Sequence, residues 1–98
     1  MKAKTPFVFI HPDTGLEATE DREQCARLLH TLHRQGGWIE AIPLGTELGS
    51  LKVHARIGNI EEKHGVDVIL KRDGRKAPNG RHFKEYCFNP ALRVVDRG

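Results

Sequence analysis

The spacing of the apolar residues changes at Gly65, and this change constrains the fold more than any other feature of the sequence. Before Gly65, apolar residues recur at the three- and four-residue spacing of amphipathic helices. After Gly65, apolar and polar residues alternate over short runs, as they do in the strands of a half-buried sheet. The chain is therefore predicted to be α+β, with helices first and a β-hairpin behind them.

The first predicted helix spans residues 20–34. Thr19 is a suitable N-cap, because its hydroxyl can accept a hydrogen bond from an otherwise unpaired backbone N–H. Gly36 and Gly37 follow the last turn, and glycine commonly ends a helix. The apolar stripe of this helix consists of Cys25, Leu28, Leu29 and Leu32. This spacing predicts that one face of the helix is buried.

Two more helices are predicted before the spacing changes. Pro43 fits the first turn of a short helix over residues 43–48, because a proline there removes no intrahelical hydrogen bond. A third helix is predicted over residues 50–64, with Ser50 as its N-cap.

Strands are predicted on both sides of these helices. Residues 66–71 and 82–88 would pair as a hairpin across a basic, turn-rich loop, and residues 38–42 would form a short strand. Residues 1–19 are predicted to form a strand-like arm that contains the run Phe-Val-Phe-Ile. Residues 91–98 are a tail that either adds a strand edge or remains loose.

The charge of the chain is unevenly distributed. The formal net charge of the 98 residues is +3. Residues 1–49 hold five basic and seven acidic residues, whereas residues 50–98 hold eleven basic and six acidic residues. A basic half beside an acidic half favours a surface that binds a polyanion.

The composition argues against a membrane or secreted protein. No apolar run approaches the roughly 18 residues that a membrane helix needs. The apolar run at residues 7–10 is too short for a secretory signal, so a cytoplasmic location is expected. For the two cysteines, Cys25 and Cys87, buried reduced thiols are favoured over a disulfide, because nothing indicates an oxidising compartment.

Residues 49–65 read GSLKVHARIGNIEEKHG. This segment resembles the pattern G-x-x-R-L-A-A-R-I-x-D-L-R-x-x-G of small winged-helix proteins that are common in bacteriophages and prophages. The run FKEYCF resembles the R-Y-x-L-like last strand of that family, with Tyr86 and Phe88 at the matching aromatic and apolar positions. The sequence departs from the family's pattern at Gly45, Lys52 and His54.

The resemblance covers residues 20–88 and implies a winged helix-turn-helix fold, in which three helices precede a β-hairpin wing. The domain would span residues 20–90, with residues 1–19 as an N-terminal arm and residues 91–98 as a C-terminal tail. The family implies a DNA-binding protein that regulates transcription, of phage or prophage type.

The outer face of the predicted 50–64 helix favours contact with a large anion. The face expected to pack on the core consists of Val53, Ile57 and Ile60. Opposite it, Ala55 and Gly58 carry no long side chain, so the backbone could approach the floor of a DNA major groove, which is about 12 Å wide. Lys52 and Asn59 flank this face and can reach base edges or phosphates. The alternative is that Gly58 accommodates another part of the protein or a dimer partner.

The residues expected to contact DNA lie in this helix and in the basic hairpin. Base edges are expected to be read by Leu51, Lys52, Ala55 and Asn59. Phosphate contacts are expected from Ser50, Lys71, Arg72, Arg75, Lys76 and Arg81. The hairpin tip could instead be an ordinary solvated turn. Arg56 could either pair with an acid of the first helix or contact phosphate.

No pattern of catalytic or metal-binding residues is found. Cys25, His30 and His33 do not by themselves supply the four ligands of a closed zinc site, and neither a phosphate-binding glycine loop nor a nucleophile elbow is present. We therefore expect no enzymatic activity, metal or cofactor. The expected partner is double-stranded DNA, and a homodimer could form by strand pairing at residues 7–10. The alternative function is a protein-interaction module that keeps the winged-helix scaffold without binding DNA.

Overall fold

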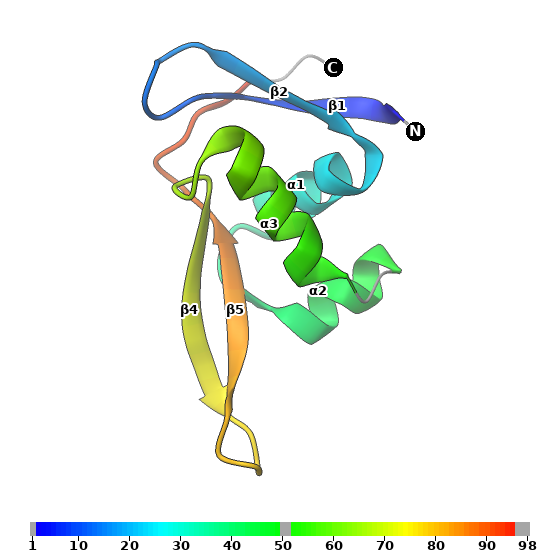
Figure 1. Cartoon of the computed structure of the whole chain (residues 1–98), viewed down its shortest axis with the longest axis vertical. Helices are drawn as coiled ribbons and strands as arrows, with labels where there is room; N and C mark the ends of the chain where they lie inside the picture. Colours follow the sequence, from blue (N-terminus) through cyan, green and yellow to red (C-terminus); the bar gives the residue numbers. More distant parts are fainter. Residues whose placement is uncertain (1, 50–51, 96–98) are drawn as a thin grey trace.

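Three helices and two small antiparallel sheets make up the protein (Figure 1). The structure is a computed structural model that describes residues 2–49 and 52–95. In chain order the elements are β1 (Lys2–Ile10), β2 (Glu17–Arg22), α1 (Glu23–Gln35), β3 (Ile39–Glu40), α2 (Ala41–Leu48), α3 (Val53–His64), β4 (Ile69–Lys76), β5 (His82–Phe88) and β6 (Val94–Val95). The predicted α+β class is confirmed.

The first sheet covers one end of the helices, and the second sheet lies beside α3 (Figure 1). The first sheet has the strand order β2-β1-β6 and lies across one end of α1 and α3. The second has the order β3-β5-β4, and its β4–β5 hairpin projects away from the helices. None of the described helices is long and apolar enough to cross a lipid bilayer.

The predicted arm is the central strand of the first sheet. Val8 pairs with Thr19 of β2 on one side and with Val95 of β6 on the other. The predicted use of residues 7–10 as an edge for dimerisation is therefore wrong, because both edges of β1 already carry a partner strand there. The C-terminal tail adds a strand edge, which was one of the two alternatives.

Helix α1 begins three residues later than predicted. Thr19 and Glu20 belong to β2, where they pair with Val8 and Phe7 of β1, so Thr19 is not an N-cap. Arg22 is the N-cap residue, and it makes no capping side-chain hydrogen bond. At the other end, Gly36 has φ 64° and donates its N–H to Leu32, as predicted for a terminating glycine.

The other element boundaries also shift. Helix α2 begins at Ala41, two residues before the predicted start, and α3 begins at Val53 with Lys52 as its N-cap residue. The predicted N-cap Ser50 lies outside the described residues. Strand β4 begins at Ile69 instead of residue 66 and continues to Lys76, so much of the predicted loop is strand. Strand β5 has the predicted bounds.

One apolar core joins both sheets to the helices. Phe7 and Phe9 of β1 are fully buried, and their ring centroids lie 5.3 Å and 6.2 Å from that of Phe88 in β5. The predicted stripe of α1 and the predicted inner face of α3 both belong to this core. Cys25 and Cys87 are buried and free, as predicted, and burial raises the pKa of both thiols.

A buried carboxylate ties β2 to the C-terminal turn of α3. Glu20 is fully buried, and Arg22 donates to it from Nε at 3.0 Å and from its terminal nitrogen at 2.6 Å. His64 Nε2 lies 3.2 Å from the same carboxylate, and Lys63 Nζ lies 3.8 Å away. Because His64 and Lys63 end α3, this cluster fixes the helix against the first sheet.

Acid is expected to weaken this cluster. Burial raises the pKa of Glu20, but the hydrogen bonds and positive charge of Arg22, with the charge of Lys63, outweigh it and lower the pKa from 4.5 to about 2. Burial lowers the pKa of His64, against the opposing charge of Glu20. Protonation of either residue is therefore more favourable in the unfolded chain. The free energy of unfolding should fall as the pH drops below 6.5, because His64 is then protonated more readily in the unfolded chain. It should fall again between pH 4.5 and 2, because the same holds for Glu20.

We predict that Glu20→Gln destabilises the protein at pH 7 by about 3 kcal/mol, because the substitution removes the carboxylate that Arg22 and His64 share. The substitution should also flatten the pH dependence between 4.5 and 2. Urea unfolding at several pH values measures both effects. Glu62→Gln, at an exposed carboxylate, is the matched control and should change neither. A Glu20→Gln profile that is parallel to wild type would contradict the assignment.

Candidate nucleic-acid interface

Helix α3 buries the face that was predicted to pack on the core and exposes the face predicted to lie opposite it. Val53, Ile57 and Ile60 are at most 4% exposed and pack in the core. Ala55 and Gly58 are exposed. The spacing of the apolar residues was sufficient to predict both faces, because a helix in contact with a core on one side leaves the opposite side in solvent.

Gly58 is not required by the packing of the described chain. A Cβ built at this position meets no heavy atom within 4 Å outside its local helical neighbours. The alternative that Gly58 makes room for another described part of this protein is therefore wrong. A glycine within a helix costs about 1 kcal/mol relative to alanine, and no contact within the described chain offsets that cost.

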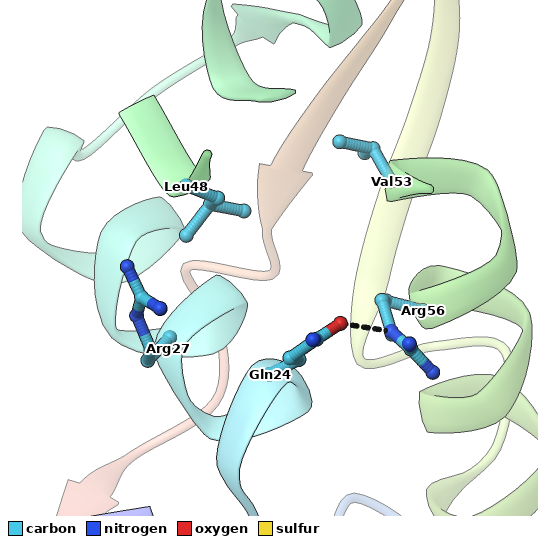
Figure 2. Close-up of a pocket in the computed structure, with 5 residues that line it drawn as sticks. All are labelled: Gln24, Arg27, Leu48, Val53 and Arg56. Atoms are coloured by element: carbon cyan, nitrogen blue, oxygen red, sulfur yellow. Dashed lines mark hydrogen bonds between the residues drawn. The ribbon is translucent and has the colours of Figure 1, made fainter. Parts of the chain in front are cut away.

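One flank of this outer face is basic and faces α1. Lys52 is exposed, and Arg56 is half-buried. Arg56 Nε donates to Gln24 Oε1 at 2.6 Å (Figure 2). Of the two alternatives for Arg56, pairing with an acid of the first helix is not seen: the partner from α1 is a neutral amide, which positions the guanidinium without neutralising its charge.

The groove between α1 and α3 brings in further residues that the sequence analysis did not include. Arg27 of α1 and Arg56 lie around a small apolar crevice with Leu48 and Val53 (Figure 2). A neighbouring cleft of about 260 Å³ is lined by Arg22, Glu23, Gln24, Cys25, Arg56 and Asn59. Sequence spacing could not find Arg22 and Arg27, because they reach this groove only through the packing of α1 on α3.

The other flank of α3 is joined to the hairpin. Lys71 Nζ of β4 lies 2.8 Å from Glu61 Oε2, and the Tyr86 hydroxyl of β5 hydrogen-bonds His54 Nδ1. Burial, and then the charge of Glu61, raise the pKa of Tyr86. These two contacts hold the hairpin beside the outer face of α3.

The hairpin has two faces with different partners. Lys71 lies opposite Tyr86 in the register, so both side chains are on the face that meets α3. Arg72 lies opposite Glu85, on the other face of the sheet, and its Nε donates to Glu85 Oε1 at 2.6 Å. Arg75 also reaches this other face, where its Nε lies 3.1 Å from Glu40 Oε2.

The hairpin tip is exposed and basic. Asn79 Oδ1 accepts a hydrogen bond from the backbone N–H of Arg81, and Gly80 has φ 86°, which forms a tight turn. The side chains of Lys76 and Arg81 are exposed and make no ion pair with the described residues. The tip is therefore available to a ligand, although the same geometry would also suit a solvated turn.

The structure brings together some of the expected DNA contacts and separates others. On or beside the outer face of α3 lie Lys52, Ala55, Asn59 and Lys71. At the hairpin tip lie Lys76 and Arg81. Arg72 and Arg75 lie on the far face of the hairpin, and Ser50 and Leu51 are outside the described residues. Among the described residues, no three His, Cys, Asp or Glu side chains are grouped in a way that could hold a metal ion.

No protein-family model, curated protein or solved structure matches this chain. We therefore infer the function from the geometry of the site itself.

We predict that Gly58→Ala stabilises the protein by about 1 kcal/mol, because the added methyl group meets open space and alanine favours the helix. The midpoint of urea unfolding measures the change. Gly65→Ala is the informative comparison: Gly65 also has open space but adopts φ 101°, so that variant should lose stability. A loss of stability in Gly58→Ala would show that Gly58 is needed by the fold.

Proposed function

We propose that this protein is a winged helix-turn-helix DNA-binding protein, and that it regulates transcription as phage and prophage proteins of this kind do. The order α1-β3-α2-α3-β4-β5 supports the proposal, because it is the order of helices and strands in a winged helix. The sheet order β3-β5-β4 supports it further, since the strand before α2 pairs beside the hairpin. In this proposal α3 is the recognition helix and β4–β5 is the wing.

The observation that carries the proposal is the bare outer face of α3 with cations on both flanks. Ala55 and Gly58 leave the helix backbone accessible, with Lys52 and Arg56 on the α1 flank and Lys71 on the hairpin flank. A DNA duplex has phosphates along both walls of its major groove, so a narrow helix with a basic α1 flank, together with a basic hairpin tip, suits it.

The residues would divide into two roles. Lys52, Ala55 and Asn59, with Leu51, would face base edges in the groove. Phosphate contacts would come from Lys71 on the hairpin flank, from Lys76 and Arg81 at the hairpin tip, and from Arg27 and Arg56 of the α1 groove. Ser50, another expected phosphate contact, lies outside the described residues. Because Glu61 and Glu62 lie in the C-terminal half of α3, only its N-terminal turns would enter the groove.

We expect binding to duplex DNA that weakens steeply with salt, because each phosphate contact releases counterions. Lys52→Glu should lower the affinity by about 1–3 kcal/mol, which is roughly 5- to 150-fold. Fluorescence anisotropy of a labelled duplex at two salt concentrations measures both effects. Arg93→Glu makes the same charge change at an exposed position near β6 and should have little effect. Equal losses in the two variants would indicate a response to net charge alone, and no binding to any duplex at low salt would refute the function.

Selection from a random duplex library would separate the two roles. Asn59→Ala should relax the sequence preference at one position, whereas Lys76→Glu should weaken binding to all sequences alike and reduce the salt dependence. A protein-interaction module without DNA binding is the second candidate, and it predicts no enriched sequence in this selection.

A further inference from the structure

The second sheet has a face turned away from α3, which we call the outer sheet face. Strand alternation and register place Glu40 of β3, Arg72 of β4 and Glu85 of β5 on one row of this face. Trp38, Leu70, Arg75 and Phe83 complete the face. The contacts to α3 come from the opposite side, through Lys71 and Tyr86.

Two arginines on this face repeat one arrangement. The guanidinium of Arg72 lies 4.2 Å from the centroid of the Trp38 ring, and Arg72 Nε donates to Glu85. The guanidinium of Arg75 lies 4.5 Å from the centroid of the Phe83 ring and is paired with Glu40. Each arginine thus lies over an aromatic ring and is paired with a carboxylate, which fixes its position before any partner binds.

The charge balance of the outer sheet face differs from that of the α3 flanks. Two arginines face two glutamates here, so the face is neutral as a whole. A surface that follows a phosphate backbone needs excess positive charge. A neutral surface with a tryptophan, a phenylalanine and arginines instead resembles the centre of a protein–protein interface, where tryptophan and arginine often dominate the binding energy.

The face continues into an apolar recess. Trp38 is 36% exposed and lines a cleft of about 490 Å³. The rest of the cleft comes from the end of α1 and the segment after β5, namely Leu32, His33, Gly36, Gly37, Cys87, Phe88, Pro90 and Leu92. The outer sheet face therefore offers both an apolar surface and a hollow that a side chain of a partner can fill.

We propose that the outer sheet face binds the same face of a second copy, which gives a two-fold symmetric homodimer. In a two-fold interface each surface must be complementary to itself. The outer sheet face can meet this condition in its charge, because arginines and glutamates are equal in number there. An acidic or basic partner would gain less from a face that has no net charge. The proposal is independent of DNA binding, since α3 lies on the other side of the sheet and stays uncovered.

The balanced charge allows a decisive test by charge segregation. The variant R72E/R75E makes all four charged positions of the face acidic, and E40K/E85K makes all four basic. Wild type is expected to dimerise with increasing concentration in analytical ultracentrifugation. Each double variant alone is expected to be monomeric, because like charges would meet across the interface. An equimolar mixture of the two variants is expected to restore a dimer.

The control variant is K76E/R81E, which reverses two charges at the tip of the same hairpin. It should dimerise like wild type, since the tip lies beyond the proposed contact. Circular dichroism melting checks that every variant is folded. If a double variant is unfolded, the exposed single substitution R75E is paired with E40K in its place.

Three results would overturn the proposal. The first is a wild type that is monomeric at all concentrations, which would leave the face to a different partner. The second is a dimer that persists in both double variants, which would place the interface elsewhere. The third is a mixture of folded variants that remains monomeric. None of these results would affect the salt-dependent DNA binding proposed for α3, so the two proposals fail separately.

Discussion

Burial of the inner face of α3 is the constraint on which the functional surface depends. Ile57 and Ile60 pack between the apolar stripe of α1 and the aromatic residues of the sheets, and this contact leaves Ala55 and Gly58 in solvent. The rotation of the helix about its own axis is fixed by these few apolar side chains. The outer face is therefore a direct result of core packing, because a helix that buries one stripe must expose the opposite one.

Polar contacts fix the ends of the same helix. The carboxylate of Glu20 holds the C-terminal turn through His64, and Arg56 is positioned by Gln24 along one flank. On the other flank, His54 is held by Tyr86. The buried carboxylate is the most sensitive of these points, since leaving its partners unpaired in the interior is more costly than losing an exposed ion pair.

The hairpin separates two chemical surfaces by the thickness of one sheet. Towards α3 it contributes Lys71 and Lys84, which are paired with Glu61 and Asp73. On its outer sheet face it contributes Arg72 and Arg75, which are paired with Glu85 and Glu40 and also lie over aromatic rings. The two faces therefore differ in their aromatic contacts, since an arginine over a ring has a second contact that the paired lysines lack. The proposed DNA contacts and the proposed dimer interface would therefore lie on opposite faces of one short hairpin.

The sequence by itself determined the apolar stripe of α1, the inner and outer faces of α3 and the bounds of β5, because these features depend on local periodicity and on nearby glycines. It did not determine the strand at Glu20, whose acidic surroundings are typical of a helix start. That residue became part of β2 because Arg22 and His64 stabilise its buried charge, and His64 is distant in sequence. It also did not determine the side on which Arg75 lies. Simple alternation would place Arg75 with Lys71, but a register shift between Asp73 and Lys76 turns it to the outer sheet face, and such an irregularity depends on the pairing of two strands.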